Sequence, residues 1–179
     1  MKETMRLAVI LLVIASVAGA ILAFSNNATA GRIEEINAQI TQEALSDIFG
    51  NIDEAKELAD QDKMREEYKD LKEIFEIIEN GESKGHSLTV FSNGYDGAIE
   101  MMVGIDSEGN IMGVRLVNHS ETQGIGSKAD EPEFTDLFND QNVEEEIEVQ
   151  LISGATISSE AVLKGTNYAR EIYNEYVID

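Results

Sequence analysis

The stretch AIEMMVGIDSEGNIMGVRLVN, residues 98–118, decides the fold class predicted for this chain. Its two halves, 98–106 and 110–118, are rich in apolar and β-branched residues, and Ser107-Glu108-Gly109 separates them. Gly109 can adopt the positive φ that a tight reverse turn requires. The stretch therefore predicts an antiparallel hairpin. Because no helix lies between the two predicted strands, an α/β crossover fold is less favoured.

The segments around this hairpin continue the pattern of short strands and turns. Further β-prone runs lie at 73–79, 86–92 and 147–152, and the turn pairs Asn80-Gly81 and Asn93-Gly94 follow the first two runs. The remaining regular elements are predicted to be helices, a short one from Pro132 through Phe138 and a closing one over 157–177. The predicted fold class is thus α+β, with a mainly antiparallel sheet packed by helices.

The region before the first predicted strand has two parts. Apolar residues recur at spacings of three and four between residues 33 and 49, which predicts one helical stripe that continues the preceding segment or packs on the domain. Residues 53–72 alternate in charge and predict a solvated helix or an irregular excursion. We therefore divide the chain into an anchor (1–30), a helical connecting region (31–72) and a main domain (73–179).

The N-terminal run LAVILLVIASVAGAILAF, Leu7 to Phe24, has the length and composition of a transmembrane helix. Its 18 residues include no charge, and at about 1.5 Å per residue they reach roughly 27 Å, close to the hydrocarbon thickness of a bilayer. Lys2 and Arg6 precede the run, which predicts a cytoplasmic N-terminus in the plasma or inner membrane and an extracytoplasmic main domain. A cleaved signal peptide ending at Ala28-Thr29-Ala30 is the alternative, and it places the domain on the same side.

Composition excludes several classes of function. The 35 acidic residues against 13 Lys and Arg give a net charge of −22, which repels phosphate backbones and disfavours nucleic-acid binding. The chain has no cysteine and two histidines, which excludes iron–sulfur clusters, thiolate zinc sites and a histidine-rich metal site. If the protein is a redox protein, an organic cofactor must supply the redox chemistry.

Ser153-Gly154-Ala155-Thr156 lies between a predicted strand and the closing helix. The backbone N–H groups of a first helical turn have no partners and favour a phosphate there. Gly154 and Ala155 leave room for a bulky group, Ser153 can cap the helix, and Thr156 offers a hydroxyl beside the phosphate-binding end. By physical reasoning alone, an ordinary cap and tight turn remains the commoner explanation.

Two motifs carry a resemblance to a known family. SGATISS at 153–159 and ETQGIG at 121–126, together with Asn93-Gly94-Tyr95 and the N-terminal anchor, resemble the FMN-binding domain family. Within it the chain is similar to the G subunits of Rnf electron-transport complexes and to the C subunits of sodium-pumping NADH:quinone reductases. The resemblance covers nearly the whole chain. Two positions depart from the family pattern: Gln123 replaces a proline, and Gln150 replaces an aspartate that the family often has three residues before the serine.

The resemblance implies a covalent cofactor. It implies FMN joined through its phosphate to the Thr156 hydroxyl, installed outside the cytoplasm by a flavin transferase that uses FAD. The other cofactor-binding residues it implies are Ser153, Gly154, Ala155, Glu121, Thr122, Gly124 and Gly126. No catalytic or metal-ligating residue is predicted.

The implied function is that of an electron-transfer subunit, not catalytic alone, among the other membrane subunits of an ion-translocating ferredoxin:NAD oxidoreductase. The alternatives are an FMN carrier of another extracytoplasmic electron-transfer system and a non-flavinylated assembly subunit.

Overall fold

The computed structural model describes residues 2–59 and 61–177, which form two compact units divided between Thr41 and Gln42. Helix α1 (Lys2–Phe49) makes up the described part of the first unit and continues into the second. Within the described ranges, α1 is the one helix long and apolar enough to cross a membrane, with a mean hydropathy of 2.9 over its most apolar window. This helix supports the membrane anchor expected from the sequence. It also runs without a break through Ala28-Thr29-Ala30.

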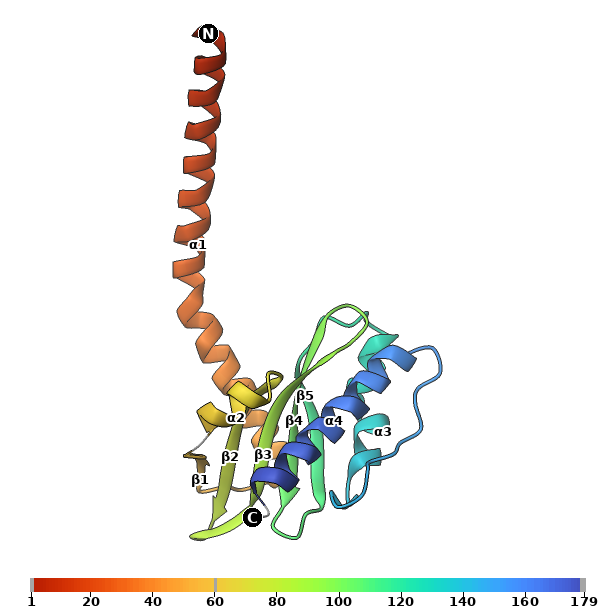
Figure 1. Ribbon diagram of the computed structural model, residues 1–179. Helices are drawn as coiled ribbons and strands as arrows, with labels where there is room; N and C mark the ends of the chain where they lie inside the picture. The colour runs from red at the N-terminus through yellow and green to blue at the C-terminus, as the bar shows by residue number, and fades with distance from the viewer. Residues whose placement is uncertain (1, 60, 178–179) are drawn as a thin grey trace. The chain divides into compact units, whose positions relative to one another are not determined.

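The second unit is built on a five-stranded antiparallel sheet whose strands neighbour one another in chain order (Figure 1). The strands are β1 (Glu54–Glu57), β2 (Leu71–Glu79), β3 (Glu82–Asn93), β4 (Ala98–Asp106) and β5 (Ile111–Asn118). Each pairs antiparallel with the next, as a meander does. The predicted α+β class is confirmed.

The turn residues account for the register of two hairpins. Gly109, between β4 and β5, has φ +82°, as the sequence predicted. Asn80 and Gly81 have φ +54° and +80°, and the flanking Glu79 and Glu82 pair directly. Two consecutive positive φ values match the twist of a two-residue hairpin, and asparagine and glycine tolerate them best.

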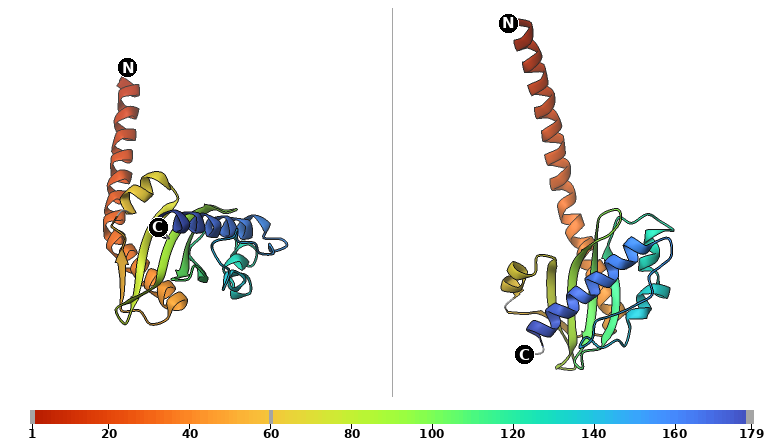
Figure 2. Two further views of the ribbon diagram at one scale, coloured as in Figure 1. Left: turned by 60° about the horizontal axis from the view of Figure 1, so that its bottom comes forward. Right: turned by 45° about the vertical axis from the view of Figure 1, so that its right-hand side comes forward.

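The remaining helices follow the sheet. They are the 3₁₀ segment η1 (Gly126–Asp130), α3 (Pro132–Thr135), the 3₁₀ segment η2 (Asp136–Phe138) and α4 (Thr156–Tyr176). Pro132 does open a short helix, and the helical backbone reaches Phe138 as expected. Helix α4 lies along one face of the sheet, over β3 and β4 (Figure 2).

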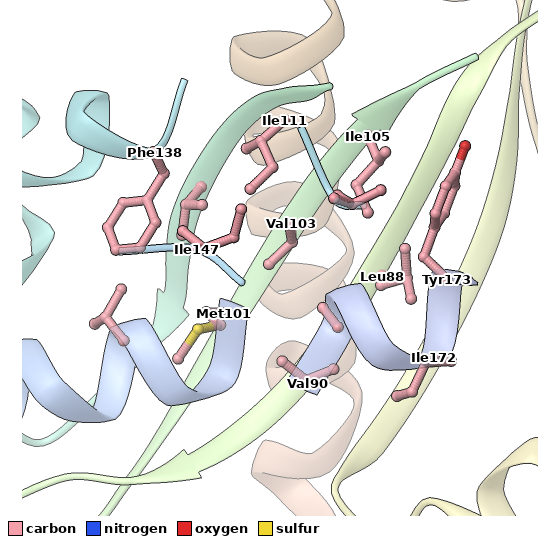
Figure 3. Close-up of a cluster of buried hydrophobic side chains, with 14 of the residues drawn as sticks. Leu88, Val90, Met101, Val103, Ile105, Ile111, Phe138, Ile147, Ile172 and Tyr173 are labelled. Atoms are coloured by element: carbon pink, nitrogen blue, oxygen red, sulfur yellow. The ribbon is translucent and has the colours of Figure 1, made fainter. Parts of the chain in front are cut away.

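The main hydrophobic core lies between α4 and the sheet. Figure 3 shows side chains of β3 and β4, among them Val90 and Met101, on the side that α4 covers with Ile172 and Tyr173. These four side chains are at most 3% exposed. Alternate residues of each strand contribute to this face, as the two-residue period of a strand requires.

The end of α1 packs on the opposite face of the sheet. Ala44, Leu45, Ile48 and Phe49 are buried there against Ile77 and Met102. A Cβ at Gly104 would lie 2.9 Å from the Phe49 ring and nearer still to Ile48, so this glycine allows the helix to approach closely. Ile33 and Ile36, which the sequence placed on the same stripe, are exposed. The buried part of the stripe is thus its last two turns.

The strand predicted at 147–152 is wrong: this segment is irregular. Ile147 donates its backbone N–H to Asn167 Oδ1 at 2.9 Å, and its carbonyl accepts Asn167 Nδ2 at 2.9 Å. The Asn167 side chain on α4 therefore satisfies the backbone groups that a neighbouring strand would otherwise bond.

The helix or irregular excursion predicted for 53–72 is also wrong in part. Residues 54–57 form the edge strand β1, and the segment ends in α2 (Gln61–Glu67) and the start of β2. Three of the four β1 side chains are charged and exposed. Charged side chains protect an edge strand from pairing with another chain. They also remove the alternation of apolar and polar residues by which a strand is recognised in a sequence. The sheet consequently begins before residue 73.

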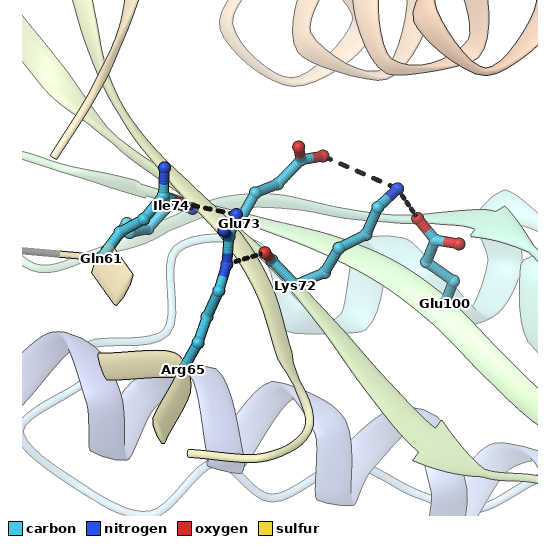
Figure 4. A network of polar contacts seen from close by, with 6 residues as sticks. All are labelled: Gln61, Arg65, Lys72, Glu73, Ile74 and Glu100. Carbon is cyan, nitrogen blue, oxygen red and sulfur yellow. Dashed lines mark hydrogen bonds and ion pairs between the residues drawn. The ribbon is translucent and has the colours of Figure 1, made fainter. Parts of the chain in front are cut away.

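A polar network joins α2, β2 and β4 (Figure 4). Lys72 Nζ lies 2.6 Å from Glu100 Oε1, and Arg65 Nε donates to the Lys72 carbonyl at 2.5 Å. Gln61 Oε1 accepts the Ile74 N–H at 3.2 Å. The network supplies a cation for the nearly buried Glu100 carboxylate, which would be costly to bury alone.

Candidate cofactor site

One cavity of about 410 Å³ brings the two sequence motifs together. Its lining includes Glu121 and Gly126, from the segment after β5, and Gly154 to Ser158, at the start of α4. Tyr95, from the turn between β3 and β4, completes the wall. A volume of this size is typical of sites for small molecules and cofactors.

The first turn of α4 opens into this cavity without a side-chain cap. The N-cap residue is Ala155, which offers no hydrogen-bond acceptor from its side chain, and the first helical bond runs from the Ser159 N–H to the Ala155 carbonyl. In the described part of the chain, the N–H groups of Thr156, Ile157 and Ser158 have no acceptor. Alanine is among the least favourable N-cap residues, costing about 0.5–2 kcal/mol relative to serine or aspartate. The arrangement leaves the helix end free for an external anion.

Thr156 is the first residue of α4, and its side chain is exposed at the cavity. Its hydroxyl makes no hydrogen bond among residues 2–59 and 61–177. Gly154, two residues earlier, has φ +85°, and no atom lies within 4 Å of the position that a Cβ would occupy. The backbone there turns sharply and stays open, so a bulky group can reach the Thr156 hydroxyl and the helix end together.

Ser153 does not cap the helix, contrary to the prediction. It is exposed, precedes the N-cap by two residues and lies outside the described lining of the cavity. The turn at Gly154 displaces the N-cap position to Ala155. Gly124 also lies outside this lining. Its N–H donates to Ser127 Oγ at 2.9 Å, and its φ of +74° bends the loop that carries Glu121 and Gly126.

Glu121 is the buried acidic residue of the cavity, 5% exposed. Its Oε1 accepts the backbone N–H groups of Tyr95 at 2.8 Å and Asp96 at 3.2 Å, and its Oε2 accepts the Ser158 hydroxyl at 2.5 Å. Thr122 Oγ1 donates to Asp96 Oδ2 at 2.6 Å. The two predicted residues therefore hold the cavity together through side-chain hydrogen bonds.

Large apolar side chains surround the opening. Tyr95, Ile125 and Ile157 are 68%, 54% and 51% exposed, and all three line the cavity. Among the described residues of the second unit, Leu137 is the one other large apolar side chain that is so exposed. Such a concentration of exposed apolar surface around one cavity marks a binding site. It suits a flat, partly apolar ring system.

A histidine–aspartate pair supports the loop that carries Glu121. His119 Nδ1 accepts the Glu121 N–H at 3.2 Å, which leaves Nε2 facing Asp130 Oδ2 at 3.7 Å. Burial raises the pKa of the Asp130 carboxyl above its usual value, and the neighbouring His119 partly opposes that shift. The ring of His119 thus has a structural role in positioning the Glu121 backbone.

Sequence reasoning named most of this site and missed part of it. Six of the eight residues predicted to bind the cofactor line this cavity: Glu121, Thr122, Gly126, Gly154, Ala155 and Thr156. The lining residues that were not among the predicted cofactor-binding residues are Tyr95, Ile125, Ile157 and Ser158. Ser158 lies within the SGATISS motif, so its position two residues after Thr156 was the available signal.

These residues fit a flavin nucleotide. The uncapped helix end matches a phosphate, the Thr156 hydroxyl can form an ester, and the apolar rim matches the isoalloxazine ring. Together with the α+β fold, they define the class of this protein: a flavin-binding domain that follows an apolar N-terminal helix.

Comparison with known proteins agrees with that class. The model of the family described as "FMN-binding domain" matches residues 94–171. The G subunit of the Na⁺-translocating ferredoxin:NAD⁺ oxidoreductase complex of Acetobacterium woodii is 32% identical, over 96% of this chain and 92% of its own length. The G subunit of the ion-translocating oxidoreductase complex of Methanosarcina acetivorans is 28% identical over 94% and 93%.

A solved structure shows the same fold. The C subunit of the Na⁺-translocating NADH-quinone reductase from Parabacteroides distasonis superposes with a TM-score of 0.61 at 19% identity, covering 81% of this chain and 94% of that one. The chain belongs to the G subunits of ion-translocating ferredoxin:NAD oxidoreductase (Rnf) complexes and carries the FMN-binding domain of that family. It is thus an electron-transport subunit that binds FMN in a multi-subunit complex.

Proposed function

We propose that the chain holds FMN through a phosphoester bond to the Thr156 Oγ1 and carries electrons as a membrane-anchored, extracytoplasmic subunit of an Rnf-type complex. The observation that carries this proposal is the uncapped first turn of α4, with an exposed threonine hydroxyl at its first position. Bound FMN would supply reversible uptake and release of electrons, and the protein would supply its position and surroundings.

The proposed site divides its work between three groups of residues. The N–H groups of the first turn of α4 would hold the phosphate, and Gly154 and Ala155 would leave space for it. Gly126 would allow the loop backbone to lie close to the cofactor, while Glu121 and Thr122 hold that loop in place. Gly124 bends that loop, and Ser153 is exposed two residues before the N-cap.

The electron-transfer role has a direct test. The full-length chain, produced in a host that contains the flavin transferase, is purified in detergent and titrated with a chemical reductant and then an oxidant. We expect one flavin per chain whose visible absorbance is bleached and restored reversibly. A chain with no flavin absorbance would favour the assembly-subunit alternative. Reversible flavin chemistry in a chain that purifies with other redox partners would favour a different electron-transfer system.

The orientation rests on Lys2 and Arg6 before the apolar run and on a strongly acidic region after it. We propose that the membrane subunits of the complex pack around the apolar helix and that the transferase modifies the domain outside the cytoplasm. In this proposal residues 1–30 anchor the chain, residues 31–72 connect the anchor to the domain, and residues 73–179 form the flavin domain. Strand β1, from the connecting region, adds to the sheet of that domain.

The absence of cysteine makes the orientation easy to test. A single Lys164→Cys substitution places a thiol on α4, where the lysine side chain is 68% exposed. In intact cells we expect a membrane-impermeant maleimide to label this variant and to leave the matched Lys2→Cys variant unlabelled until the membrane is permeabilised. The reverse pattern would place the domain in the cytoplasm and would contradict the proposed site of flavin attachment.

A further inference from the structure

Glu121 occupies a position that binding of a cofactor does not explain. It is 5% exposed, and each carboxylate oxygen already accepts a hydrogen bond from the protein. No lysine, arginine or histidine of the described chain forms an ion pair with it. Two backbone N–H groups and one hydroxyl therefore compensate its charge, together with the positive end of the α4 dipole.

The carboxylate is tightly enclosed by two glycines. A Cβ added at Gly94 would overlap Glu121 Oε1, and one added at Gly126 would overlap Glu121 Oε2. The two glycines belong to different segments: Gly94 to the turn between β3 and β4, and Gly126 to the start of η1. The carboxylate thus fills the space where these two segments meet α4.

The bonds of Glu121 join three parts of the cavity wall. Oε1 binds the 94–97 turn, Oε2 binds Ser158 on α4, and the backbone of Glu121 belongs to the loop between them. Thr122 adds a second bond to the same turn through Asp96. The turn itself closes with a bond from the Gly94 N–H to the Gly97 carbonyl at 2.8 Å. Tyr95 at its tip is 68% exposed and faces the cavity that Thr156 also lines.

We propose that Glu121 is a positioning residue that ties the 94–97 turn to the first turn of α4, so that the Tyr95 ring forms a fixed wall for the flavin ring. Glu121 acts through hydrogen-bond geometry and does not itself contact the phosphate. The part of this proposal that concerns the flavin rests on the proposed function. The part that concerns the turn holds for the chain without flavin.

The choice of variants separates geometry from charge. Glutamine at position 121 can still accept the Tyr95 and Asp96 N–H groups through its carbonyl and can donate to the Ser158 oxygen through its amide. Alanine leaves all three groups without a partner. The matched control is Glu100→Ala, which removes another nearly buried carboxylate, one that pairs with Lys72 and does not line the cavity.

Two measurements on the full-length chain test the proposal. Amide hydrogen exchange reports whether the Tyr95 and Asp96 N–H groups are bonded, and time-resolved fluorescence anisotropy reports how freely the flavin ring rotates. For Glu121→Ala we expect at least tenfold faster exchange at these two amides and faster rotation of the flavin. For Glu121→Gln we expect values close to the wild type, and for Glu100→Ala unchanged values at the site.

Each other outcome contradicts the proposal. Unchanged exchange in Glu121→Ala would show that the turn does not depend on this carboxylate. Equal losses in Glu121→Gln and Glu121→Ala would show that charge, and not geometry, is what matters. Faster exchange with unchanged flavin rotation would refute the role of the wall. The exchange experiment can be repeated in the Thr156→Ala chain, where it needs no flavin. A failure of flavin attachment can therefore be distinguished from a failure of Glu121 to tie the 94–97 turn to α4.

Discussion

The full-length chain carrying Thr156→Ala is expected to lose all flavin fluorescence that survives denaturation. The phosphoester needs the Thr156 oxygen, and alanine has none, while the backbone N–H groups of α4 stay in place. In-gel fluorescence of chains produced with the transferase measures the effect against total protein. Thr156→Ser, which keeps a hydroxyl on the same first residue of the helix, is expected to retain attached flavin at a reduced level.

Two controls sharpen this expectation. Ser153→Ala removes an exposed hydroxyl from the same motif and is expected to leave the fluorescence unchanged. Hydrogen exchange or circular dichroism of Thr156→Ala should match the wild type, because the Thr156 hydroxyl makes no hydrogen bond in the described chain. A fluorescent band that persists in Thr156→Ala would assign the flavin to another residue, and one that disappears in Ser153→Ala would give Ser153 the role proposed for Thr156.

Replacing Gly126 by alanine is expected to lower the stability of the domain and its flavin content together. The new Cβ would lie 2.8 Å from Ser158 Oγ and closer still to Glu121 Oε2, at the hydrogen bond that joins these residues. Overpacking of this kind typically costs about 1–3 kcal/mol. For a chain of this length each kcal/mol lowers the Tm by about 2–4 °C.

The comparison that isolates this effect uses Gly31→Ala. Gly31 lies in α1, and no atom is found within 4 Å of the position that its Cβ would take, so alanine there should be neutral or slightly stabilising. Thermal unfolding followed by circular dichroism gives the stability, and the ratio of flavin to protein absorbance gives the content. A Gly126→Ala chain with wild-type Tm and wild-type flavin content would refute the close packing around Glu121.

The local parts of the fold were predictable because the deciding interactions lie within a few residues. Gly109 and the pair Asn80-Gly81 need positive φ, and their hairpins form where the sequence placed them. The segment 147–152 failed because its backbone partner is a side chain 20 residues further along, Asn167. The apolar residues of this segment indicate burial. Burial does not distinguish a strand from an irregular segment, because both can be buried.

The candidate site shows the same division between local and long-range information. The place of Thr156 at the start of a helix follows from one short motif. The cavity wall depends on Tyr95, Glu121 and Ser158, which come from three separate segments and meet only through the folded sheet. The sequence alone could name Glu121 as a site residue, but its hydrogen bonds, and hence its supporting role, required the structure.

The central claim is one FMN bonded through its phosphate to Thr156, and fragmentation mass spectrometry of the intact full-length chain tests it most directly. We predict a mass that exceeds that of the amino acids by one FMN less one water, with the added mass assigned to Thr156 in the fragments. An unmodified chain from a host with an active transferase, or a flavin mass assigned to any other residue, would contradict the account.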